Sequence, residues 1–230
     1  MKALVSCQIA FEFAEKTGVE AISLKPYKRL DTPVATHADM LFCVLDKTVF
    51  CYEDYVIDNG FESIIRAEGY DLVFVSNKCA PEYPNDISLN VLVMGKLLFC
   101  YVKHTAKEIL EYAKKSGYEV INVKQGYSAC STLVIDENTA ITSDKCIASA
   151  IEGAGKEVLF VSNEEIILPG YNCGFIGGAT GKTGGSVCFF GDVSALKDGE
   201  RIVELLNRKK QCIISISSGR VYDFGGIKLL

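Results

Sequence analysis

The residues best suited to chemistry in this chain lie in two short segments. Residues 125–135 run from a polar, glycine-containing loop into strand-forming residues, and Cys130 stands where the character changes. The second segment is His37-Ala38-Asp39, which precedes an expected hairpin. A thiol becomes a nucleophile when a base or a nearby cation favours its thiolate, and a histidine within hydrogen-bond reach supplies either. The two segments therefore indicate cysteine-dependent chemistry, provided that the fold brings Cys130 and His37 together.

Composition and charge narrow the classes of function. The chain of 230 residues has 49% hydrophobic residues and a net charge of -5, and its basic run at 208–210 closes an expected helix, where cations are favoured anyway. No apolar run approaches the roughly 18 residues that a membrane span requires, and the first residues contain no long apolar signal core. We therefore expect a cytoplasmic protein that binds neither nucleic acid nor membrane. The composition does not indicate an oligomeric state.

The ten cysteines do not indicate disulfides or a metal site. None of them forms a C-x-x-C pair, and neither of the two histidines adjoins a cysteine, so no zinc knuckle assembles locally. Cys43, Cys100 and Cys188 lie inside apolar runs, which is typical of small buried hydrophobic residues in a reducing compartment. We expect no metal and no cofactor.

A repeated pattern of short elements predicts the fold. Strand-like runs recur at intervals of about 40 to 55 residues, a period typical of closed or stacked repeat proteins. A glycine stands directly before four of these runs, as expected where a helix must end. The runs are residues 19–24, 70–75, 118–123, 156–161 and 211–216. The hairpins expected after them are 40–45 with 48–52, 89–93 with 97–101, 131–135 with 139–142, and a weaker glycine-rich one within 174–190.

The two ends of the chain complete this pattern. Residues 220–230 contain only one strand, and residues 3–9 can supply its partner. Five strand–hairpin–helix units closed by this pairing predict an α/β fold, a five-bladed pseudo-symmetric α/β propeller in a single domain over residues 1–230; a three-layer α/β sandwich is the alternative. In a propeller the equivalent positions of all units converge on a central channel, where Cys130 and His37 can face each other. Without that convergence both are ordinary residues.

The two reactive segments resemble parts of a known enzyme superfamily. Residues 130–135, preceded by Gly126, are similar to the catalytic-cysteine segment of dimethylarginine dimethylaminohydrolases, and residues 83–93 resemble the unit before it in that family. His37-Ala38-Asp39 is similar to the His-x-Asp motif of arginine and agmatine deiminases. These families are penteins, the guanidine-modifying superfamily, whose five-bladed propeller agrees with the fold expected above. The resemblance is best over residues 34–145.

The resemblance implies a role for six residues. Cys130 would attack the guanidinium carbon and form a covalent intermediate, and His37 would protonate the leaving amine and then activate water. In these families a carboxylate beside a Gly-Gly pair orients the histidine, and Asp223 matches that carboxylate with a spacing that differs by one residue. A planar cation is held well by paired carboxylates. The implied substrate-binding residues are Asp39, Asp86 and Asn90.

The chain departs from the superfamily in the order and content of its units. The catalytic cysteine belongs to the last unit in the superfamily, whereas two units follow Cys130 here, and the next one has Gly177-Gly178 where an acidic guanidinium-binding segment is expected. The expected function is a cysteine-dependent hydrolase or transferase acting on a guanidine- or amidine-like group of a small cation. The alternative is a pentein-fold binding protein without catalysis. A thiol-based sensor is a third hypothesis, which requires a second cysteine close to Cys130.

Overall fold

The computed structural model describes residues 1–230 as short strands alternating with short helices. The strands are β1 (Lys2–Ser6), β2 (Glu20–Leu24), β3 (Phe42–Leu45), β4 (Thr48–Cys51), β5 (Asp71–Phe74), β6 (Leu92–Met94), β7 (Leu97–Cys100), β8 (Glu119–Asn122), β9 (Thr132–Asp136), β10 (Thr139–Thr142), β11 (Glu157–Phe160), β12 (Thr180–Thr183), β13 (Ser186–Phe189), β14 (Cys212–Ser215) and β15 (Ile227–Leu229). The helices are α1 (Ala10–Thr17), α2 (Ala38–Leu41), α3 (Glu53–Asn59), α4 (Phe61–Ala67), α5 (Lys107–Lys115), α6 (Lys145–Gly153) and α7 (Gly199–Arg208), with 3₁₀ turns at Thr32–Val34 and Val193–Ala195.

The strands form five separate three-stranded sheets of one design. In each sheet two strands pair in antiparallel fashion, and the third joins in parallel after a helical connection, as in β3-β4-β5 and β6-β7-β8. The first sheet, β15-β1-β2, combines both ends of the chain, with Ala3 opposite Leu229. The expected pairing of the two ends is therefore confirmed, as are the five expected single strands, which are β2, β5, β8, β11 and β14.

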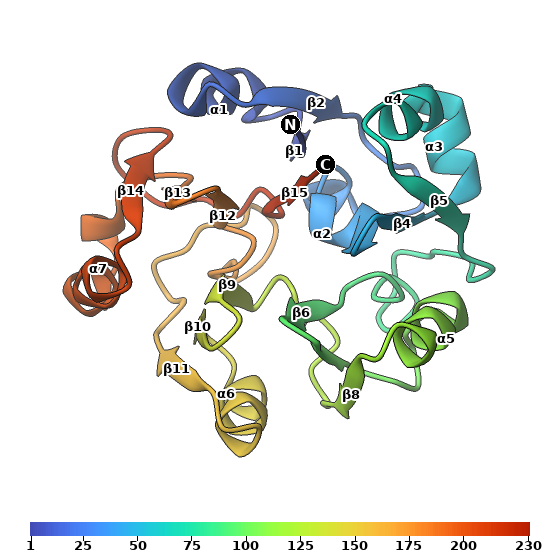
Figure 1. Ribbon diagram of the computed structural model, residues 1–230. Coiled ribbons are helices and arrows are strands. Elements are labelled where there is room, and N and C mark those ends of the chain that lie inside the picture. Colours follow the sequence, from blue (N-terminus) through green and yellow to red (C-terminus); the bar gives the residue numbers. More distant parts are fainter.

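The five sheets lie around a common centre, with the longer helices on the outside and the one-turn helix α2 near the centre beside β15 (Figure 1). Strands β3, β6, β9, β12 and β15 face that centre, and α1, α4, α5, α6 and α7 pack on the outermost strands β2, β5, β8, β11 and β14. The inner strands of neighbouring sheets contact each other in the pairs β6 with β9, β9 with β12, β12 with β15, and β15 with β3. No hydrogen-bonded ladder joins one sheet to the next, so the sheets do not form a closed barrel.

Each helix ends and covers its strand for local reasons. Gly18, Gly69, Gly117 and Gly155 all have positive φ, between 69° and 80°, which is the conformation that lets a helix stop and the chain turn back into a strand. In α7 the apolar residues Ile202, Leu205 and Leu206 are buried and recur at helical spacing. None of the helices is both long and apolar enough to cross a membrane.

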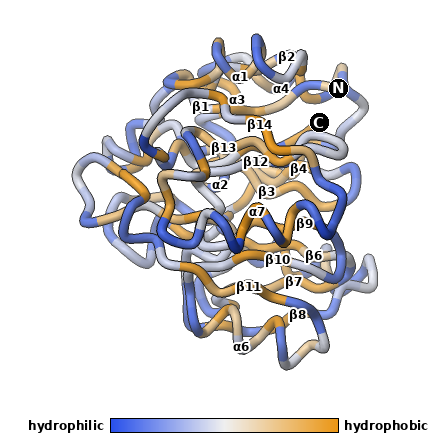
Figure 2. The backbone as a smooth tube through the Cα atoms, turned by 90° about the vertical axis from the view of Figure 1, so that its left-hand side faces the viewer, coloured by the Kyte–Doolittle hydropathy of each residue, from blue (hydrophilic) through white to orange (hydrophobic).

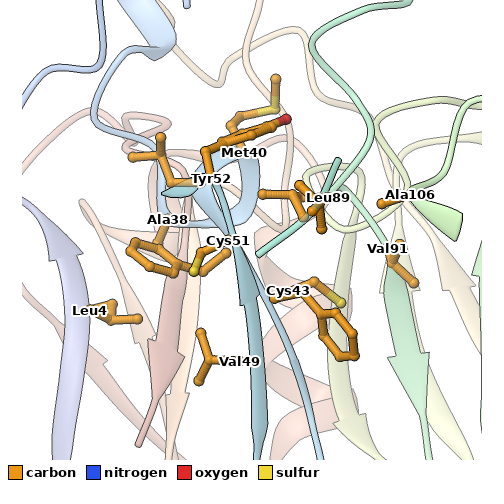
Figure 3. Close-up of a cluster of buried hydrophobic side chains, with 14 of the residues drawn as sticks. Leu4, Ala38, Met40, Cys43, Val49, Cys51, Tyr52, Leu89, Val91 and Ala106 are labelled. Carbon is orange, nitrogen blue, oxygen red and sulfur yellow. The ribbon is translucent and has the colours of Figure 1, made fainter. Parts of the chain in front are cut away.

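The core is divided among the sheets because each sheet is small. The largest cluster has 32 buried residues and surrounds β3 and β4, and Figure 3 shows part of it, with Cys43 and Cys51 among Leu4, Val49 and Val91. Figure 2 shows the same distribution along the chain, with hydrophobic segments in interior strands such as β3 and β4 and hydrophilic segments in the outer loops. Cys43, Cys100 and Cys188 are buried, which confirms the interpretation of the thiols in apolar runs.

Two expected hairpin strands begin later than the sequence indicates. Residues 40 and 41 belong to α2, and residues 89–91 precede β6 without joining it. The apolar pattern was correct about burial, since Met40, Leu41, Leu89 and Val91 are all buried. The difference matters for function, because the one-turn helix α2 carries His37 at its N-cap and Asp39 in its first turn.

Candidate functional site

A cavity of about 240 Å³ brings together reactive side chains from four of the five repeated units. His37, Asp86, Cys130 and Asp223 all line it, and they lie in the segments that precede the inner strands β3, β6, β9 and β15. Equivalent positions of the repeated units therefore converge, as the propeller prediction required for Cys130 and His37.

Cys130 ends a tight turn and is buried. The backbone N–H of Ser131 donates to the carbonyl of Tyr127, which fixes the turn, and the Cys130 side chain is 4% exposed. Burial raises the pKa of the Cys130 thiol well above its ordinary value, and the carboxylates of Asp39 and Asp223 act in the same direction. The thiol is thus held mainly protonated while no cation is present.

Asn90 connects the thiol to the backbone around it. Its Oδ1 accepts the Ala129 N–H at 2.8 Å, so its Nδ2 must point the other way, where it donates to Cys130 Sγ at 2.9 Å and to the Asp39 carbonyl at 3.1 Å. These contacts occupy the amide, and Asn90 does not line the cavity. Donation to sulfur favours the thiolate and lowers the thiol pKa, against the effect of burial.

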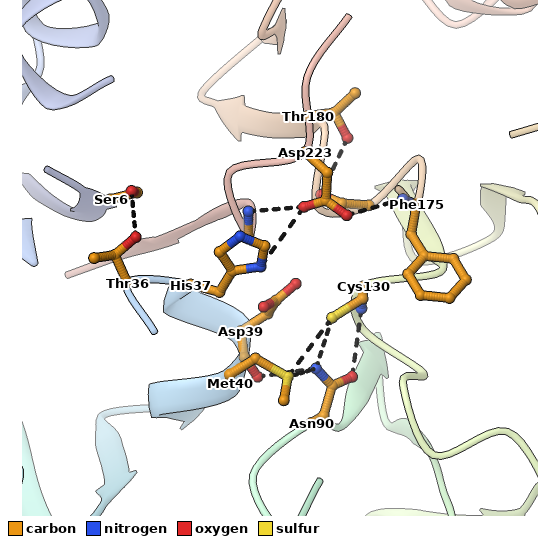
Figure 4. A network of polar contacts seen from close by, with 12 residues as sticks. Ser6, Thr36, His37, Asp39, Met40, Asn90, Cys130, Phe175, Thr180 and Asp223 are labelled. Atoms are coloured by element: carbon orange, nitrogen blue, oxygen red, sulfur yellow. Dashed lines mark hydrogen bonds and ion pairs between the residues drawn. The ribbon is translucent and has the colours of Figure 1, made fainter. Parts of the chain in front are cut away.

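His37 and Asp223 form a buried pair on the other side of the cavity. Nδ1 of His37 lies 3.7 Å from Oδ1 of Asp223, and both side chains are 2% exposed (Figure 4). Asp223 is fixed by the backbone N–H groups of Gly225, at 2.9 Å to Oδ1, and of Phe175, at 2.9 Å to Oδ2. A Cβ at Gly225 would lie 2.2 Å from the His37 Cβ, so only glycine allows the chain to pass this close to the histidine.

Asp39 carries a carboxylate that the protein leaves without partners. It is 3% exposed, and neither oxygen accepts a hydrogen bond of normal geometry, while the Cys130 thiol is near enough to lower its pKa. Figure 4 shows the carboxylate pointing between His37 and Cys130. Burial raises the pKa of Asp39 to about 6, opposed by His37. Asp39 lies behind the wall of the 240 Å³ cavity rather than in its lining, and it lines a second cavity, of about 300 Å³, together with Lys182 and Lys228.

Asp86 presents one free oxygen to the first cavity. Its Oδ2 accepts the Tyr127 hydroxyl at 2.7 Å, whereas its Oδ1 is buried without a partner. Burial raises the pKa of Asp86, and the Tyr127 hydrogen bond opposes that rise. Buried carboxylate oxygens without partners are costly, so Asp39 and Asp86 together indicate a place for a ligand that donates hydrogen bonds.

The structure leaves no room at Gly177 and Gly178 for the acidic side chains expected after Cys130. A Cβ at Gly177 would lie 2.2 Å from the Ala129 carbonyl oxygen, and a Cβ at Gly178 would lie 2.0 Å from Asp223 Oδ1. The Gly178 N–H also donates to the Cys130 carbonyl at 3.0 Å. The two glycines therefore bring their backbone against the cysteine turn and Asp223.

Several cavity residues gave no signal in the sequence. Tyr127 lies in the cysteine segment itself, and its contact with Asp86 depends on two units meeting in space. Phe175 and Cys173 belong to the long connection before β12, where no periodic pattern exists. Cys173 is a second cysteine that lines the cavity. No three His, Cys, Asp or Glu side chains are arranged to hold a metal ion.

Comparison with solved structures identifies the fold. The chain is similar to a mutant dimethylarginine dimethylaminohydrolase from Pseudomonas aeruginosa complexed with citrulline, at 10% identity and a TM-score of 0.53, covering 90% of this chain and 78% of that one. It is similar to the agmatine deiminase of C. jejuni at 14% identity and a TM-score of 0.52, with 90% and 72% covered. It is also similar to an inosamine-phosphate amidinotransferase from Streptomyces griseus, at 12% identity and a TM-score of 0.52, with 95% and 75% covered.

These similarities show a pentein-like fold, that of guanidine-modifying enzymes, which agrees with the resemblance found in the sequence. No curated protein matches the sequence. Residues 5–228 match the model of a family of unknown function, DUF6873, and the chain belongs to that family.

Proposed function

We propose that this protein is a cysteine-dependent hydrolase or amidinotransferase that acts on a guanidine- or amidine-like group of a small cation. The observation that carries the proposal is the Asp39 carboxylate, which is buried beside the Cys130 thiol without a partner on either oxygen. A planar cation with N–H groups would satisfy both oxygens and place its central carbon near the sulfur. In this proposal the five sheets are the blades of a pentein propeller.

The reaction would proceed by covalent catalysis. The Cys130 thiolate attacks the central carbon of the guanidinium and forms a C–S bond; the C–N bond to the leaving group then breaks, and the leaving nitrogen takes a proton from His37. Water attacks the sulfur-bound carbon, gives a proton to His37, and the C–S bond breaks to return the thiolate. An amine in place of water makes the same sequence an amidino transfer.

The raised pKa of Cys130 fits activation by the substrate. In the empty site, burial and two carboxylates keep the thiol protonated. A cation bound at Asp39 neutralises a carboxylate and adds positive charge beside the sulfur, and both changes lower the thiol pKa. The proton that Cys130 releases would pass to His37, which then gives it to the leaving nitrogen. Asp223, which faces His37 at 3.7 Å, would keep the histidine oriented while its protonation changes.

The rival proposal is a binding protein that keeps the pentein fold without catalysis. The glycines in the place of the acidic segment favour this alternative, because they leave no room for its carboxylates. Either protein would work in the cytoplasm, where its ten cysteines stay reduced.

The test is the labelling of Cys130 by 2-chloroacetamidine, a planar cation, against iodoacetamide, which is neutral, over a range of pH. Cys7, Cys146 and Cys212 are exposed, so labelling is measured at each cysteine by peptide mass spectrometry. We expect the amidine to react preferentially at Cys130, and His37→Ala to change that preference. The Cys130→Ala variant gives the background. If Cys130 shows no preference for the amidine, the binding protein becomes the better proposal.

A further inference from the structure

The side chains that line the cavity of about 240 Å³ indicate the chemistry of the part of the substrate that does not react. Beyond the reactive groups, the cavity is lined by Val34, Met40, Leu168 and Phe175 and by the tyrosines 127 and 171. The rings of Tyr127 and Phe175 lie 6.0 Å apart at 33°, so they form a continuous aromatic wall. Such a surface gains free energy by contact with apolar groups.

The charged groups around this cavity are acidic, apart from His37, which is paired with Asp223. Its ionisable lining residues are His37, two aspartates, two cysteines and two tyrosines, and none is a lysine or an arginine. A carboxylate on the ligand would therefore lose its hydration beside two acidic residues without gaining a cationic partner. At the mouth, the half-exposed Tyr171 donates its hydroxyl to Asp31, which adds another negative charge there.

The volume limits the size of the ligand. About 240 Å³ corresponds to roughly eight water molecules at their share of liquid volume, so the ligand is small. Asp86 is 4% exposed, and its free Oδ1 offers a second place for an N–H donor of the ligand.

From these observations we infer that the substrate is a small guanidine or amidine whose substituent is uncharged and apolar, alkyl or aryl, rather than an amino acid or another carboxylate. The inference rests on the proposed function for the position of the cationic group. It adds that the opposite end of the molecule contacts Leu168 and Phe175 instead of a salt-bridge partner.

The test compares two ligands that differ only at the far end, butylguanidine and 4-guanidinobutanoate. Their dissociation constants are measured by calorimetry with the Cys130→Ser variant, which removes the proposed nucleophile. We expect butylguanidine to bind at least tenfold more tightly, and Phe175→Ala to weaken butylguanidine severalfold while unsubstituted guanidinium is unaffected. Equal or tighter binding of 4-guanidinobutanoate overturns the inference, and so does the absence of binding by both.

A second variant guards against a merely structural effect. Asn172 also lines the cavity and is exposed, so Asn172→Arg adds a cation at its mouth while the Tyr171–Asp31 hydrogen bond is retained. We expect this variant to reduce the preference for butylguanidine at least threefold, and an unchanged preference overturns the inference. Failure here is distinguishable from failure of the proposed function: if 2-chloroacetamidine still labels Cys130 selectively, only the assignment of the substituent falls.

Discussion

Nδ2 of Asn90 lies 2.9 Å from Sγ of Cys130, and the same amide holds the backbone of Ala129 through its Oδ1. The Asn90 side chain, from the segment before β6, thus supports the Cys130 thiol, which lies in the segment before β9. Because the amide orientation is set by the Ala129 N–H, the group facing sulfur is a donor, which favours the thiolate.

Replacing Asn90 by aspartate should suppress the reactivity of Cys130. The Asn90→Asp variant keeps an acceptor for Ala129 but places a carboxylate where the donor stood, so the thiol pKa rises further. We expect alkylation of Cys130 by iodoacetamide at pH 8 to slow by at least about tenfold, the effect of one pKa unit. Asn122→Asp is the control, since Asn122 accepts the Val102 N–H at an exposed site. Equal rates in wild type and Asn90→Asp would refute this role for Asn90.

The fold was predictable because local signals repeat. Apolar runs of similar length recur five times, and a glycine precedes four of them, so β2, β5, β8, β11 and β14 were predicted to within a residue at each end. The starts of the hairpins were not, because an apolar residue in a buried one-turn helix such as α2 looks the same as one in a buried strand.

The site was predictable only in part. The sequence indicates which side chains converge, but whether a side chain faces the cavity depends on contacts between units. Asn90 was expected to bind substrate, whereas its amide is occupied by Cys130, Ala129 and Asp39. The hydrogen bond from Tyr127 to Asp86 joins residues that are 41 positions apart in the sequence, and no local pattern indicates it.

Neutralising Asp39 should stabilise the ligand-free protein above about pH 6. Burial raises the pKa of Asp39 from 3.8 to about 6, so the folded protein binds more protons there than the unfolded chain does. The stability from protonated Asp39 is fully present below about pH 4 and is lost as the pH rises through about 6. We expect Asp39→Asn to raise the free energy of unfolding by on the order of 2 kcal/mol at pH 8 and to change it little at pH 3.5, by urea denaturation.

The control for this prediction is Asp58→Asn, at an exposed position of α3. Its effect on stability should be small and the same at both pH values. If Asp39→Asn also has the same effect at pH 3.5 and pH 8, the carboxylate of Asp39 is not the source of a pH-dependent cost.

Adding one methyl group at Gly178 should disrupt the site, because a Cβ there would lie 2.0 Å from Asp223 Oδ1. We expect Gly178→Ala to lower the free energy of unfolding by about 1 to 3 kcal/mol through overpacking and to abolish selective labelling of Cys130 by 2-chloroacetamidine as Asp223 moves from His37. Gly153→Ala is the matched control, since a Cβ at this exposed end of α6 meets no atom within 4 Å. Similar stability losses in both variants would contradict the close packing inferred at Gly178.

Removing the hydroxyl of Tyr127 tests whether Asp86 holds the ligand. The Tyr127→Phe change leaves both oxygens of a buried carboxylate without partners, so the pKa of Asp86 rises and its charged form becomes rarer at neutral pH. We expect a loss of about 1.5 to 3 kcal/mol in stability at pH 8, the range for a hydrogen bond to a charged group, and weaker binding of butylguanidine. Tyr112→Phe, which removes an exposed hydrogen bond of 3.3 Å to Asp46, should change neither. If the Tyr127→Phe variant binds butylguanidine at pH 8 as tightly as the protein that retains Tyr127, Asp86 does not contact the ligand. The cation is then held at Asp39 alone.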